Sequence, residues 1–135
     1  MVYLVPQLKI FVNKWFSRWC RKEAISDSAL CTAVEEMEQG LVDAKLGGNL
    51  YKKRVAAPGK GKSGSYRTLL AFKSKDRVFF IYGFPKSSRD NINDKEERAL
   101  KALAKELLGY DETAIGKATK AGEIRRVRCD NEQKK

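Results

Sequence analysis

The stretch that decides the fold is YRTLLAFKSKDRVFFIYGF, which runs from Tyr66 to Phe84. It holds two apolar runs, rich in aromatic and aliphatic residues, on either side of a short polar turn at residues 74–76. This pattern predicts a β-hairpin. Residues 78–82 are almost continuously apolar, which is typical of a central strand covered on both of its faces.

Outward from this hairpin, residues 50–56 have strand character, and the loop 58–64 joins them to the hairpin. Apolar residues spaced by three and four predict helices on both sides of the strands. Ser26 and Asn93 are suited to cap two of these helices, and Glu96 would complete a capping box. In chain order we predict strand 8–12, helices 13–22 and 26–40, strands 50–56, 66–74 and 77–84, helices 93–109 and 111–121, and strand 123–127.

This order predicts an α+β fold, in which two N-terminal helices and the C-terminal helices pack on one face of a small, twisted antiparallel sheet. The chain has 135 residues, the size of a single domain. We expect that domain to span residues 1–128, followed by a polar, disordered tail over 129–135. Trp15 and Trp19 lie on the apolar stripe of the first helix, which favours a place in the core over a role in stacking on bases.

The charge of the chain points to a polyanionic partner. Its 28 lysine and arginine residues outnumber 17 aspartate and glutamate residues, for a net charge of +11. A field of this sign attracts nucleic acids above all, although an acidic protein would also be attracted.

The cysteines and the absent histidine restrict the chemistry. Cys20, Cys31 and Cys129 are odd in number and lack a CxxC spacing, and the chain has no histidine, so a Cys/His zinc site is excluded. We expect reduced thiols, no metal and no cofactor in a cytoplasmic protein. Pro6 and Lys9 interrupt the N-terminal apolar run, so we expect neither a signal peptide nor a membrane span.

The loop Gly59-Lys60-Gly61-Lys62-Ser63-Gly64 matches the dinucleotide-binding pattern GxGxxG and, in Gly-Lys-Ser, the end of a Walker A motif. Its structural context fits neither. A phosphate-binding loop of either kind leads into a helix, whereas a predicted strand follows this loop. We interpret it as a basic flap whose Lys60 and Lys62 can touch an RNA backbone.

Basic and aromatic side chains gather on the predicted sheet. Lys52 and Arg54 share one face of their strand because alternate residues point the same way, and Arg67 lies on the neighbouring strand. This pattern suits an RNA-binding platform, and it equally suits the solvent side of any half-exposed sheet. The further candidates for contact with RNA are Tyr66, Tyr82, Lys86 and Arg89.

Three segments carry a resemblance to a known family: YKKRV at 51–55, GSYRTL at 64–69 and FIYGFPKSSRDNI at 80–92. Together they resemble the RelE/ParE toxin superfamily, and within it the HigB-type, RelE-like toxins of type II toxin–antitoxin systems. The likeness extends over about residues 9–127. The loop has Ser87 where RelE-like enzymes often have arginine, and Ile92 lies near the place of their late catalytic tyrosine.

The resemblance implies a metal-independent endoribonuclease that cuts mRNA in the ribosomal A site. It assigns catalytic roles to Lys52, Arg54 and Arg67. Arg67 would stabilise the phosphate with its bidentate fork, and Lys52 is the candidate base, because crowding by Arg54 and Arg67 would disfavour its charged form. Arg54 and Lys86 would hold flanking phosphates, and Arg89 would either do the same or pair with Asp90.

The resemblance also implies partners: the ribosome, mRNA and a cognate antitoxin. We expect the antitoxin to be a small helix-turn-helix protein, and we expect the toxin to contact operator DNA only through it. Two other functions fit the composition. One is a ParE-like inhibitor of DNA gyrase, and the other is an RNA-binding module without catalysis.

Overall fold

The computed structural model describes residues 8–56, 64–73 and 76–129. These residues form six strands and four helices, and the α+β class is confirmed. The elements are β1 (Lys9–Asn13), α1 (Lys14–Glu23), α2 (Asp27–Glu38), β2 (Ala44–Gly47), β3 (Leu50–Val55), β4 (Tyr66–Phe72), β5 (Arg77–Pro85), α3 (Asp94–Leu108), α4 (Glu112–Lys120) and β6 (Ile124–Val127).

The strands form one mixed sheet in the order β2-β3-β4-β5-β1-β6. β3, β4 and β5 make an antiparallel meander, but β1 pairs with β5 in parallel. The prediction of a wholly antiparallel sheet is therefore wrong at this pair. Two helices and three strands separate β1 from β5 in the chain, so no hairpin forces the two to run in opposite directions.

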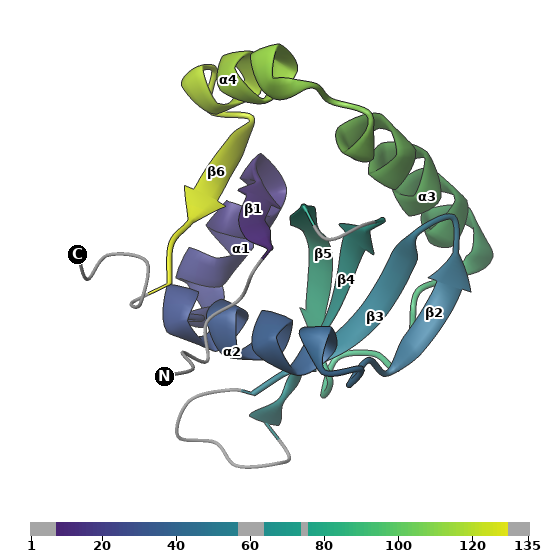
Figure 1. Ribbon diagram of the computed structural model, residues 1–135. Coiled ribbons are helices and arrows are strands. Elements are labelled where there is room, and N and C mark those ends of the chain that lie inside the picture. Colours follow the sequence, from purple (N-terminus) through teal and green to yellow (C-terminus); the bar gives the residue numbers. More distant parts are fainter. Residues whose placement is uncertain (1–7, 57–63, 74–75, 130–135) are drawn as a thin grey trace.

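Helices cover both faces of the sheet, whereas one covered face was predicted (Figure 1). The core under α1 and α2 receives Val78 and Phe80 of β5, and the core under α3 and α4 receives Phe79 and Ile81. This is why β5 is apolar at consecutive positions. Among the helices of the described ranges, none is long and apolar enough to cross a membrane.

The predicted helix caps are confirmed. The side chain of Ser26 accepts a hydrogen bond from the backbone of Ala29, and Asn93 and Glu96 form the capping box of α3. The four-residue strand β2 was not predicted from the sequence. Half-buried and exposed residues alternate in β2 over only four positions, too few to be recognised as a strand pattern. Gly47, Gly48 and Asn49 have positive φ angles and turn the chain back onto β3.

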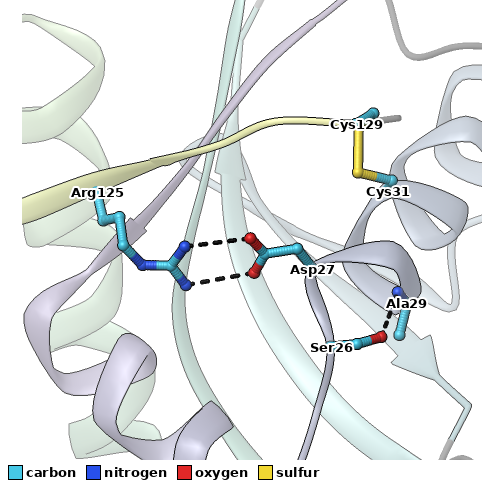
Figure 2. The surroundings of a disulfide bond; sticks show 6 residues. All are labelled: Ser26, Asp27, Ala29, Cys31, Arg125 and Cys129. Atoms are coloured by element: carbon cyan, nitrogen blue, oxygen red, sulfur yellow. Dashed lines mark hydrogen bonds and ion pairs between the residues drawn. A yellow bond between two sulfur atoms is a disulfide. The ribbon is translucent and has the colours of Figure 1, made fainter. Parts of the chain in front are cut away.

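The prediction of reduced thiols is wrong for two cysteines, because Cys31 of α2 and Cys129 form a disulfide (Figure 2). Cys129 had been assigned to the polar tail, but it is buried. Beside the disulfide, Arg125 of β6 reaches Asp27 at the start of α2 with its two terminal nitrogens at 3.3 and 3.4 Å. These contacts fasten β6 to α2, and the cysteines no longer support a cytoplasmic location.

We predict that loss of the disulfide destabilises the protein without changing its fold. The bond joins residues 98 apart, and such a link should add about 5 kcal/mol by restricting the unfolded chain. Urea unfolding of the oxidised protein, with and without a reductant, measures this difference. The Cys31→Ser variant is the control: its stability should match that of the reduced protein and should not respond to the reductant. Equal stability of oxidised and reduced protein would contradict the prediction.

Candidate functional site

The centre of the candidate site is a pair of arginines on adjacent strands. Arg54 of β3 lies directly opposite Arg67 of β4, and Arg67 lies opposite Phe84 of β5. Residues paired in this way point to the same face of the sheet, with Cβ atoms about 5 Å apart. The register therefore brings together two guanidinium groups that the sequence had placed on separate strands.

Lys52 extends this cluster by one row. It lies opposite Leu69, which in turn lies opposite Tyr82, so Lys52 is a diagonal neighbour of Arg67 on the same face. We call Lys52, Arg54 and Arg67 the basic face. Lys53, between two of them in sequence, points the other way and binds Glu36 of α2 at 2.7 Å.

The basic face carries unbalanced positive charge. Arg54 is exposed, whereas Lys52 and Arg67 are half-buried. Among the described residues no carboxylate forms a salt bridge with any of the three. Like charges directly opposite each other destabilise a sheet. The buried Nε of Arg67 also has no hydrogen-bond partner within the described ranges. A bound anion would relieve the repulsion between the two guanidinium groups.

Arg89 borders the basic face. Its guanidinium lies 5.2 Å from the centre of the Phe84 ring and makes a bidentate pair with Glu96, not with Asp90. The hydrogen bonds from Arg89 are the main reason that the pKa of Glu96 falls from 4.5 to about 2, and the backbone of Asn93 lowers it further. Glu96 in turn raises the pKa of Arg89. This pair anchors the segment after β5 to the first turn of α3.

Tyr82 links this pair to an aromatic cluster. Its hydroxyl lies 3.4 Å from Glu96, and burial followed by the charge of Glu96 raises its pKa, so it stays protonated at neutral pH. The centroids of the Trp15 and Tyr82 rings are 4.8 Å apart. Trp19 is in the core as predicted, at 8% exposure, but Trp15 is 44% exposed, so the prediction of a buried pair is wrong for Trp15.

Of the other predicted contact residues, Tyr66 lies away from the basic face and Lys86 borders it. Tyr66 is only 3% exposed and belongs to the core under α1 and α2, where its hydroxyl donates to the carbonyl of Glu23. It therefore faces away from Arg67. Lys86 is exposed just beyond β5, and its backbone N–H donates to Ser65. Lys60 and Lys62 lie outside the described residues.

Two contacts at the site were not predicted from the sequence: Phe84 beside Arg67, and the ion pair of Glu96 with Arg89. Glu96 was recognised only as part of the capping box, although Arg89 seven residues earlier is a suitable partner. Ile92 is buried in the same core cluster as Phe84. Within the described ranges, no group of three or more histidine, cysteine, aspartate or glutamate side chains is placed to hold a metal ion.

Comparison with known proteins identifies a family. The model described as "RelE toxin of RelE / RelB toxin-antitoxin system" matches residues 8–127. These residues include every helix and strand described above, and the superfamily predicted from the basic strands is thereby confirmed. No curated protein matches the chain significantly.

We predict that Glu96→Gln makes the protein less stable at neutral pH and that the difference disappears in acid. The folded state lowers the pKa of Glu96, so this group stabilises the fold above pH 4.5, and the contribution is lost as the pH falls towards 2. Glutamine keeps the capping geometry and removes the charge. Melting temperatures of both proteins between pH 7 and pH 2.5 test this. A constant difference across that range would contradict the assigned pair.

Proposed function

The chain belongs to the RelE toxin family, and from this premise we propose that it is the toxin of a toxin–antitoxin pair and cuts messenger RNA on the ribosome. The observation that carries the proposal is the basic face, where Lys52, Arg54 and Arg67 converge without carboxylate partners among the described residues. Such a surface binds a phosphodiester and leaves its charges available to the transition state.

The proposed reaction uses the 2′-hydroxyl of the RNA itself as the nucleophile. The ribose 2′-oxygen forms a bond to the adjacent phosphorus, the bond from phosphorus to the 5′-oxygen breaks, and the products carry a cyclic phosphate and a free 5′-hydroxyl. The reaction needs a base for the 2′-hydroxyl, an acid for the leaving oxygen and positive charge at the phosphoryl oxygens.

Arg67 is placed to supply the positive charge. It lies at the centre of the basic face, is half-buried, and forms no salt bridge with a described residue. A guanidinium presents two parallel N–H groups to a phosphate and keeps its proton at any physiological pH. Arg54 and the exposed Lys86 would bind the neighbouring phosphates.

Lys52 is the candidate base. Of the three cations of the basic face it is the one whose side chain can release a proton, since arginine remains charged. It lies one row from Arg67, within reach of a nucleotide bound there. Near the place of the late tyrosine of RelE-like enzymes the chain has the buried Ile92. We therefore propose that the ribosome completes the positioning of the RNA.

We predict that cleavage depends on the ribosome. The purified protein should cut mRNA in translating ribosomes at codon-associated positions and should leave the same free RNA largely intact, as mapped by sequencing of RNA ends. Rapid cutting of naked RNA would refute the dependence. DNA breaks with an SOS response in expressing cells, without RNA cuts, would instead support inhibition of gyrase.

We predict that Arg67→Ala abolishes toxicity and leaves the protein folded. Truncation removes charge from a half-exposed sheet position, so stability should change little, whereas loss of one such donor slows chemistry by about 100-fold or more. Arg67→Lys should recover only part of the activity, because lysine lacks the bidentate fork.

The matched control is Arg98→Ala on the exposed side of α3, which removes the same charge and should remain toxic. Growth arrest at equal expression and circular dichroism give the two readouts. A fully toxic Arg67→Ala variant would exclude the site, and an unfolded one would show that Arg67 is structural.

We further propose that a cognate antitoxin, a small helix-turn-helix protein, binds the helical side of the toxin near residues 15–37. The complex would then be too large to enter the ribosomal A site. The pair would act in the cytoplasm, where ribosomes are, and would reach operator DNA through the antitoxin. An antitoxin that covered the basic face instead would lose affinity for Arg67→Ala. Titration calorimetry with this variant tests the proposal.

A further inference from the structure

A second basic surface lies away from the basic face. A cavity of about 420 Å³ is bounded by α1, by the end of β1 and by the turn that leads from α4 into β6. The basic face is on β3 and β4, and β6 is three positions from β4 in the sheet, a separation of roughly 14 Å. The two surfaces are therefore distinct.

Five cations line this cavity, and none of its lining residues is acidic. Lys14, Arg18 and Arg21 follow one another at four and three residues, so they share one side of α1. The two other basic lining residues come from β6. The five are Lys14, Arg18, Arg21, Arg125 and Arg126.

The α1 cations are not neutralised by the fold. Arg125 is bound to Asp27, and Arg126 lies 5.9 Å from the centre of the Phe11 ring. By contrast, none of the salt bridges between described residues involves the exposed side chains of Lys14, Arg18 or Arg21. The side chain of Arg21 donates a long hydrogen bond of 3.5 Å to the hydroxyl of Ser17.

This arrangement does not serve the stability of α1. A cation in the first turn opposes the helix dipole, and the first turn of α1 contains Lys14 and no acidic residue. Like charges four residues apart, such as Lys14 and Arg18, also destabilise a helix. Lys14 and its repulsion with Arg18 thus cost stability in the free protein, whereas Arg21 in the last turn suits the helix dipole. An anionic ligand would offset the cost at Lys14 and Arg18.

We propose that this cavity binds phosphate groups of a nucleic-acid backbone, at a second site independent of the catalytic one. Arginine forks match phosphate oxygens, and Arg18 and Arg21 line this cavity beside Lys14 without a salt bridge to any described residue. An acidic protein is the competing partner, but separate carboxylates on a protein surface do not present the regular charge of a nucleic-acid strand.

The test is the salt dependence of binding to a single-stranded 2′-O-methyl RNA, which lacks the attacking hydroxyl and cannot be cut. Failure of the cleavage proposal would therefore not affect the result. The variant Lys14→Gln/Arg18→Gln/Arg21→Gln should bind more weakly. The slope of log K against log salt should fall by about 2, because each lost phosphate contact removes about 0.7. Fluorescence anisotropy of the labelled RNA measures both quantities.

The matched control is Lys95→Gln/Arg98→Gln/Lys105→Gln, which removes the same charge from the exposed side of α3. It should keep the wild-type slope, and circular dichroism should show both variants folded. Equal slopes for the two variants would overturn the proposal, because binding would then depend on net charge alone. Unchanged RNA binding together with lost affinity for the antitoxin would also overturn it, in favour of a protein-binding surface.

Discussion

The burial of β5 on both faces is the constraint on which the rest of the structure depends. Val78, Phe79 and Phe80 are fully buried, with consecutive side chains in opposite cores, so helices must cover both sides of the sheet. Gly83 fixes how closely α1 approaches, since a Cβ atom there would lie 2.5 Å from the ring of Trp19. A side chain at this position would displace α1 and, with it, one wall of the second cavity.

The same constraint explains where the chain can display charge. Near the middle of β5 the sheet is closed by apolar side chains, so cations have no place there without partners. Towards the end of β5, Arg67 beside Phe84 is half-exposed. The fold therefore concentrates unpaired charge at one end of the β3–β4–β5 meander, where a polyanion can approach.

Local patterns predicted part of the fold and of the site, and tertiary pairing decided the rest. The two-residue spacing of Lys52 and Arg54 correctly put them on one face. The same alternation excludes Tyr66 from the face of its neighbour Arg67, so Tyr66 was a wrong choice that strand geometry alone could have corrected. Capping depends on a few adjacent residues, and so the starts of α2 and α3 were predicted correctly. The parallel pairing of β1 with β5 and the disulfide across 98 residues had no such local signal.

The disulfide bears on the two basic surfaces unequally. It joins α2 to a residue that follows β6, and β6 supplies Arg125 and Arg126 to the second cavity. The basic face is held by the ladders of β3, β4 and β5, which contain no cysteine. In a reducing cytoplasm the cavity would lose one of the two ties between β6 and α2 and keep the Arg125–Asp27 pair, whereas the basic face would keep all its supports. Reduction would thus leave the supports of the basic face untouched, whereas β6 would be held by its ladder with β1 and by the Arg125–Asp27 pair.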